Sequence, residues 1–160
     1  MTNNDILRRV RYICDLKDNT MMEVFSLGDL DVTGEQVTGW LRREDDDAFV
    51  ELSDTELAIF LNGFINFKRG KREGDQPKPE ETINHNIVFQ KLRIALNLKA
   101  EDILAILQRA DCLLSKHELS AFFRKPDNKH YRECKDQVLR NFLLGLQIQL
   151  RPSDHESESQ

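Results

Sequence analysis

The sequence predicts an all-α protein in which two tandem homologous repeats of about four helices each pack into one globular body. Three observations lead to this prediction. The chain aligns with itself without a gap at an offset of 82 positions. Apolar residues recur at helical spacing along both copies, and the alternation typical of half-buried strands is absent. A polar stretch rich in glycine, proline and charge lies between the copies, at residues 70–82.

The internal match sets the domain organisation. Thirteen of sixty aligned pairs are identical, including Asn4/Asn86 and Gly63/Gly145. A shared amphipathic pattern alone would not align isolated glycines and aromatic residues without gaps, so we interpret the match as a duplication. The predicted parts are a first repeat at 3–69, a linker at 70–83, a second repeat at 84–151 and a disordered tail at 152–160.

Start signals predict where the helices begin. The first helix is expected at about Asp5–Leu16, with Asn3 or Asn4 as its cap, and the second at about Thr20–Leu27. Capping boxes predict three further starts, at Thr33-Gly-Glu-Gln36, Ser53-Asp-Thr-Glu56 and Ser115-Lys-His-Glu118. Asp136 is the expected cap of the last helix.

Four stretches carry a resemblance to a known family. They are Asn3-Asn4-Asp5-Ile6-Leu7-Arg8-Arg9-Val10-Arg11, Gly63-Phe64-Ile65, Leu92-Arg93-Ile94-Ala95-Leu96-Asn97-Leu98 and Phe123-Arg124-Lys125-Pro126. These stretches resemble the YehS-like family, a bacterial family of tandem-repeat proteins classed as a domain of unknown function. The resemblance covers both repeats, about residues 3–150, and implies a soluble bacterial protein. It implies no catalytic residue.

Composition predicts a soluble, cytoplasmic protein. Charged residues make up 32% of the chain and hydrophobic residues 39%. No apolar run approaches the roughly 20 residues that a membrane helix needs, and the N-terminus lacks the apolar centre of a secretory signal. Cys14, Cys112 and Cys134 form no metal-binding pattern, so a reducing compartment and no membrane association are expected.

The duplication also helps to judge the residues that carry chemistry, because residues needed by the repeat fold should recur in both copies. The histidines do not recur; they are His85, His117, His130 and His155. They have no short spacing to one another or to a cysteine, so neither a metal site nor a cofactor is predicted. Cys112 and Cys134 stand where the first copy has leucines, which favours core packing over nucleophilic chemistry. Without a paired nucleophile and base, or a glycine-rich phosphate cradle, the protein is predicted not to be an enzyme.

Charge differs most between the copies, at −6 over residues 1–70 and +5 over residues 84–151. A candidate binding patch lies on or just after the third helix of the second copy. It consists of Lys116, Arg124, Lys125, Lys129, Tyr131 and Arg132, and its counterpart in the first copy consists of Trp40, Arg42, Arg43 and Phe49. The acidic run at 44–47 lacks the spacing of a calcium loop and is interpreted as a solvated loop.

Two functions remain open for this patch. The preferred interpretation is a protein interaction or regulatory module, whose partner is another protein or a second copy of the chain. The alternative is a helix-turn-helix-like protein that binds nucleic acid through the basic second repeat. The overall net charge of −5 and the acidic first copy disfavour nucleic acid, because they repel phosphates.

A single globular body requires that neither repeat is stable alone, since a unit of about 65 residues buries only about 60% of its unfolded surface. We expect separately expressed segments 1–72 and 82–152 to be unstable or to associate with each other. Thermal melting of each segment and of the full chain, followed by circular dichroism, checks this. If each segment melts cooperatively at the temperature of the whole protein, the prediction of one body is wrong.

Overall fold

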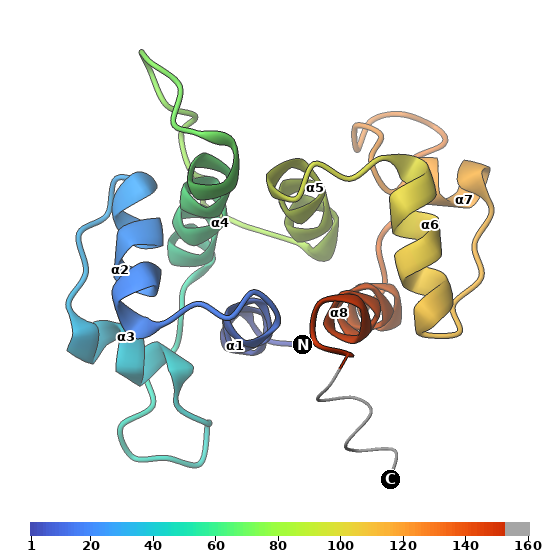
Figure 1. Cartoon of the computed structure of the whole chain (residues 1–160). Helices are drawn as coiled ribbons and strands as arrows, with labels where there is room; N and C mark the ends of the chain where they lie inside the picture. The colour runs from blue at the N-terminus through green and yellow to red at the C-terminus, as the bar shows by residue number, and fades with distance from the viewer. Residues whose placement is uncertain (153–160) are drawn as a thin grey trace, which may run out of the picture. The chain divides into compact units, whose positions relative to one another are not determined.

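The computed structural model describes residues 1–152, and its helices confirm the all-α prediction (Figure 1). In chain order they are α1 Asn3–Ile13, α2 Asp18–Leu27, α3 Gly34–Leu41, α4 Asp54–Arg69, α5 His85–Ala95, α6 Ala100–Arg109, α7 Lys116–Ala121 and α8 Asp136–Leu150. No strand occurs in residues 1–152. Apart from Pro152, the tail predicted at 152–160 lies outside the described residues.

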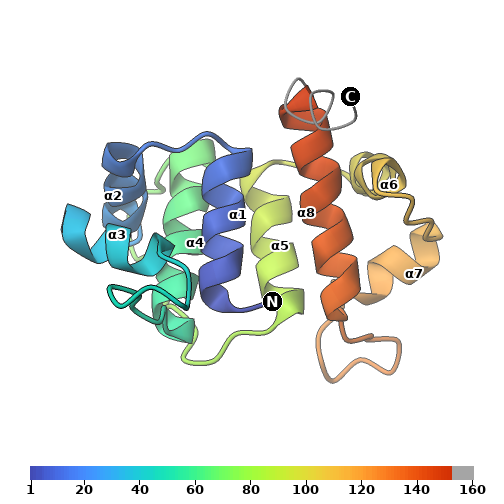
Figure 2. The same cartoon turned by 90° about the horizontal axis from the view of Figure 1, so that it is seen from below.

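The helices group into two compact units. Unit 1, Met1–Leu96, contains α1 to α5, and unit 2, which begins at Asn97, contains α6 to α8 (Figure 2). The first helix of the second repeat, α5, therefore belongs to unit 1, where it packs along α4. Nζ of Lys91 on α5 donates to Oδ1 of Asn62 on α4 at 2.6 Å and lies 3.1 Å from a carboxylate oxygen of Glu80. The compact units and the sequence repeats thus have different boundaries.

The first helix begins two residues earlier than expected, and its cap is Thr2 rather than Asn3 or Asn4. The Thr2 hydroxyl accepts from the Asp5 N–H at 3.1 Å, and the Asp5 carboxylate accepts from the Thr2 N–H at 2.9 Å. This reciprocal pair is a capping box. Partial burial raises the pKa of Asp5, but the hydrogen bonds from Thr2 and the nearby Arg8 guanidinium outweigh it and hold that pKa below its usual range.

The three capping boxes predicted from the sequence are confirmed, at Thr33, Ser53 and Ser115. The cap predicted at Asp136 is wrong. Lys135 occupies the cap position of α8 and makes no side-chain cap hydrogen bond, whereas Asp136 is the first helical residue. There its carboxylate interacts favourably with the positive end of the helix, which explains why an acidic residue recurs at this position without capping.

The side chain of Asn4 links α1 to the segment between α3 and α4. Its Nδ2 donates to the carbonyl oxygens of Trp40 and Val50, both at 2.9 Å, and its Oδ1 accepts from the Leu52 N–H at 3.0 Å. Asn4 is buried, so these bonds replace water for three backbone groups of a segment that lacks regular structure. The repeat counterpart, Asn86, is buried as well.

Close helix contacts explain the recurring pair Gly63/Gly145. A Cβ atom on Gly63 of α4 would lie 1.8 Å from the Val24 carbonyl oxygen on α2. In unit 2, a Cβ on Gly145 of α8 would lie 2.0 Å from the Ile106 carbonyl oxygen on α6. Both distances are impossible for real atoms, so each pair of helices packs at a distance that only glycine permits.

Left-handed backbone explains a second recurring pair, Asp29/Asp111. These residues follow α2 and α6 with φ of 68° and 58°. Asp15 and Asn97, which follow α1 and α5, adopt φ of 53° and 54° at matching repeat positions. Asp and Asn tolerate this conformation better than other side chains because their short polar groups bond locally.

Aromatic residues fill the core of unit 1. The Phe25 ring centroid lies 5.0 Å from that of Trp40 and 5.1 Å from that of Phe60, and Phe60 stacks on Phe64 at 6.2 Å. All four residues are buried. They join α2, α3 and α4, and two of these helices, α2 and α4, border the groove described below.

We expect Gly63→Ala to lower the free energy of unfolding by about 2 kcal/mol or more, because the added methyl forces α2 and α4 apart. Gly34→Ala is the matched control. A Cβ there meets only the Met22 sulfur, at 3.9 Å, and alanine favours the helix, so its effect should stay within about 1 kcal/mol of zero. Chemical denaturation of both variants measures the difference. Equal stability of the two variants would contradict the close contact.

Candidate functional site

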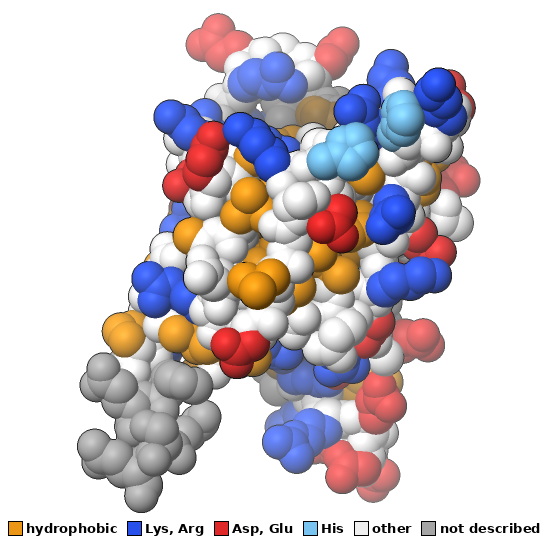
Figure 3. Space-filling model, turned by 90° about the vertical axis from the view of Figure 1, so that its right-hand side faces the viewer, with side chains coloured by type: hydrophobic (Ala, Val, Ile, Leu, Met, Phe, Trp, Pro, Cys, Tyr) orange, Lys and Arg blue, Asp and Glu red, His pale blue; other side chains and the backbone are white. Residues whose placement is uncertain are grey.

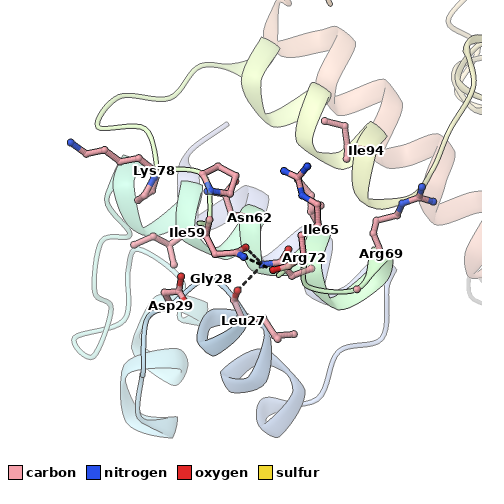
Figure 4. A pocket seen from close by; sticks show the side chains of 15 residues that line it. Leu27, Gly28, Asp29, Ile59, Asn62, Ile65, Arg69, Arg72, Lys78 and Ile94 are labelled. Atoms are coloured by element: carbon pink, nitrogen blue, oxygen red, sulfur yellow. Dashed lines mark hydrogen bonds between the residues drawn. The ribbon is translucent and has the colours of Figure 1, made fainter. Parts of the chain in front are cut away.

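Unit 1 has a groove of about 770 Å³ beside α4 (Figure 4). Apolar side chains come from three helices: Leu27 from α2, Ile59 and Ile65 from α4, and Ile94 from α5. Ile94 is 43% exposed, which is high for isoleucine. The segment 70–79, which follows α4, forms the remaining wall, and we call it the strap. The volume lies within the range of ligand pockets.

Polar side chains hold the strap in place. Asn66 on α4 donates through Nδ2 to the Leu27 carbonyl oxygen at 2.8 Å and to Oε1 of Gln76 at 3.3 Å. The Gln76 amide in turn donates to the Arg72 carbonyl oxygen at 2.8 Å. Nζ of Lys71 lies 2.8 Å from an oxygen of Asp29. These bonds connect the strap to the C-terminal end of α2 and to α4, so the groove is preformed.

The rim of the groove is positively charged. Arg69, Arg72 and Lys78 line it and are exposed. Within residues 1–152, none of these three has a carboxylate oxygen within 4 Å. The one acidic residue of the lining, Asp29, already pairs with Lys71. The groove therefore combines an apolar floor with three cations that have no carboxylate partner among residues 1–152.

A second hollow, of about 200 Å³, lies in unit 2 and is basic. Its lining consists of His117, Glu118, Ala121, Lys129, His130, Tyr131 and Arg132. The rings of His117 and His130 meet edge to face, with their centroids 6.4 Å apart. Figure 3 shows the two histidine side chains next to each other, with lysine and arginine around them. Backbone turns bring the two residues together although thirteen positions separate them.

The candidate patch predicted from the sequence is divided by the structure. Lys129, Tyr131 and Arg132 share the basic hollow. Lys116 points elsewhere and pairs with Glu101 on α6 at 3.2 Å, with both side chains about 70% exposed. Arg124 and Lys125 are exposed in the segment between α7 and α8 and do not line the hollow. Three of the six predicted patch residues thus lie at one hollow.

The predicted counterpart in the first copy does not form a matching surface. Trp40 lies in the core, 2% exposed, because it packs on Phe25. Arg42 pairs with Asp46 at 3.4 Å, and Arg43 is exposed. Phe49 is half-buried and borders a hollow that also contains Glu44 and Glu51. This side of unit 1 is acidic, so the basic surface is peculiar to the second copy.

The loops after α3 and α7 nevertheless share one backbone. In the first loop the Ala48 N–H donates to Oδ1 of Asp46, and in the second the His130 N–H donates to Oδ1 of Asn128, both at 2.8 Å. A backbone bond matches as well: residue 50 donates its N–H to the carbonyl oxygen of residue 39 at 3.0 Å, and residue 132 donates its N–H to the carbonyl oxygen of residue 121 at 3.1 Å. The copies therefore differ here in side chains and not in fold.

Sequence reasoning missed both the groove and the histidine pair. A signal for the groove was present: Ile59 and Ile65 lie off the Leu57, Phe60, Leu61 stripe of the fourth helix and indicate a second apolar face. The meeting of His117 and His130 had no such signal, because it depends on how the loop after α7 turns back. Among residues 1–152, no group of three or more His, Cys, Asp or Glu is placed to hold a metal ion.

Comparison with known proteins gives the family. The model of the family described as "Protein of unknown function (DUF1456)" matches residues 3–70 and again residues 85–151, so the chain belongs to this family and its duplication is confirmed. The chain is 49% identical over 147 residues to "Uncharacterized protein YehS" of Escherichia coli (strain K12). That alignment covers 91% of this chain and 94% of the relative. No solved structure matches. In the described part of the chain, no helix is long and apolar enough to span a membrane.

The cysteines differ in accessibility. Cys134 is buried, as predicted for a core residue, whereas Cys112 is half-buried. Burial raises the pKa of the Cys134 thiol to about 12, and the carboxylates of Asp136 and Glu133 add to this effect. Burial also raises the pKa of Cys14. A thiol with a raised pKa is a poor nucleophile because little thiolate is present.

We expect iodoacetamide at pH 8 to alkylate Cys134 at least about a hundredfold more slowly in the native protein than after unfolding in guanidinium, because burial and the raised pKa suppress the thiolate. Mass spectrometry of tryptic peptides over time measures the rate at each cysteine. Half-exposed Cys112 is the internal control and should react in the native protein. Similar native and unfolded rates at Cys134 would contradict its burial.

Proposed function

We propose that this protein is a non-enzymatic interaction module whose groove in unit 1 binds a short segment of a partner protein. The segment carries apolar side chains flanked by Asp or Glu. The observation that supports the proposal is the pairing of an apolar floor with the exposed rim of Arg69, Arg72 and Lys78.

Charge complementarity selects the occupant. The rim cations have no carboxylate partner within residues 1–152, so an acidic segment supplies one without breaking an existing pair. The apolar side chains of the segment cover Ile94 and its neighbours, which gains about 25 cal/mol for each Å² of apolar surface buried. Exposed charge pairs add only about 0–1 kcal/mol each, so apolar contact supplies most of the affinity and the rim supplies specificity.

The polar groups of the groove favour binding over catalysis. Asn62 is engaged by Lys91, and Asn66 and Gln76 bond to each other and to backbone oxygens. These side chains hold the groove open and do not converge on a common point, as the groups of a catalytic site would. We therefore assign them a structural role.

Nucleic-acid binding by a helix-turn-helix is not the function we propose. The helix that would read the DNA major groove, α7, has six residues, which is less than two turns. In the first copy, the equivalent helix starts beside Asp29, Asp31 and Glu35, whose charges repel phosphate.

The proposal is tested by panning a random peptide library on the full-length protein. Enriched peptides should contain aliphatic or aromatic residues next to Asp or Glu. Ile94→Asp should abolish their binding, measured by fluorescence anisotropy, because it places a charge on the apolar floor. Arg72→Glu should weaken binding roughly fivefold, the loss of about 1 kcal/mol for an exposed pair.

Arg43→Glu is the matched control, since it makes the same change in net charge at an exposed site outside the groove. Peptides that bind Ile94→Asp and the unchanged protein equally would place the interaction elsewhere. Enrichment of basic peptides would contradict the choice of partner.

A further inference from the structure

The basic hollow of unit 2 carries a second inference, independent of the groove. Its loop has the backbone hydrogen bonds of the first copy, yet its side chains reverse the local charge. Where the first copy has Glu35, Asp47 and Ala48, the second has His117, Lys129 and His130. The shared backbone accommodates either set, so the fold itself does not require the basic residues.

The charges that face the hollow favour an anion. Lys129 and Arg132 are positive, and Glu118 is negative. A hydrogen bond from the Ser115 N–H holds the pKa of Glu118 below its usual range, and the same carboxylate completes the cap of α7. The neighbouring Lys116 and Glu101 neutralise each other. Lys129, Arg132 and Glu118 together therefore give the lining a net charge of +1.

We infer that this hollow binds a nucleotide, with the phosphate among His117, Lys129 and His130 and the base against the ring of Tyr131. The lysine ammonium group donates charge-assisted hydrogen bonds to phosphate oxygens, and an imidazole N–H is a further donor. Tyr131 is half-buried and lines the same hollow, and aromatic side chains stack on any base. The volume of about 200 Å³ equals that of roughly six to seven liquid water molecules, which suits one phosphate group rather than a folded partner.

Two kinds of molecule present a phosphate next to a base: a free nucleotide and a single strand of nucleic acid. The probe is a fluorescent twelve-residue thymidine oligonucleotide, titrated against the full-length protein at low salt and followed by anisotropy. Competition with unlabelled thymidine monophosphate and with inorganic phosphate separates the sources. If thymidine monophosphate displaces the oligonucleotide with an inhibition constant equal to the dissociation constant of the oligonucleotide, the ligand is a free nucleotide. If its inhibition constant is much higher, the ligand is a single strand. Both results support the inference.

Substitution by the first-copy residues is the decisive comparison. The triple variant His117→Glu, Lys129→Asp, His130→Ala should lower affinity at least tenfold, because it reverses the charge without changing the loop. Tyr131→Phe, which installs the first-copy aromatic, should bind as the unchanged protein does, whereas Tyr131→Ala should lose about fivefold or more.

Circular dichroism melting shows that each variant is folded. The inference would be overturned if neither the oligonucleotide nor thymidine monophosphate bound at up to millimolar concentration, or if the triple variant bound as well as the unchanged protein. It would also be overturned if inorganic phosphate competed with the affinity of thymidine monophosphate. If Tyr131→Ala bound the oligonucleotide as tightly as the unchanged protein does, Tyr131 would not contact the base, and the ligand would no longer be assigned as a nucleotide.

Discussion

The arrangement of unit 1 depends on the hydrogen bonds of one buried amide, that of Asn4. The segment from 42 to 53 is long and irregular, and its backbone groups need partners wherever water is excluded. Asn4 supplies partners at both ends of this segment, to Trp40 and Val50 and to Leu52. Leu52 directly precedes Ser53, the cap of α4, and α4 lines the groove. A side chain without both donors and the acceptor would leave buried backbone groups unpaired, at about 1–3 kcal/mol each.

Close packing imposes the second constraint. Gly63 lets α4 approach α2 until backbone atoms touch, and Gly145 does the same for α8 and α6. The groove depends on this approach, since Leu27 at the end of α2 and Ile59 on α4 line it together. Gly63 and Gly145, which make these contacts, recur at the repeat offset. Many exposed positions make no such contact, and the difference in charge between the copies arises there.

Local physics explains what the sequence predicted well. Capping boxes at Thr33, Ser53 and Ser115 involve residues three apart, so they are visible in the sequence and were found. The duplication was visible because close contacts and left-handed turns restrict residue type. The sequence predicts Asn3 or Asn4 as a cap because a polar residue at a helix start usually is one, yet the partners of Asn4 lie 36 to 48 positions away. The groove, the placement of α5 against α4 and the meeting of His117 with His130 likewise depend on long-range packing, which periodicity does not encode.

The two candidate sites follow from the same duplication, because neither has an equivalent in the other copy. Where α4 has Ile59 and Ile65 in the groove, α8 has Asn141 and Gln147, and where α4 has Asn66, α8 has Ile148. The residues with which α4 lines the groove and holds its strap are thus not repeated on α8. The first copy, in turn, has acidic or apolar residues at the positions that make the hollow of unit 2 basic. The two repeats share the packing contacts that keep their folds alike. Each repeat also carries surface residues that these contacts do not determine, and the two candidate sites are built from such residues.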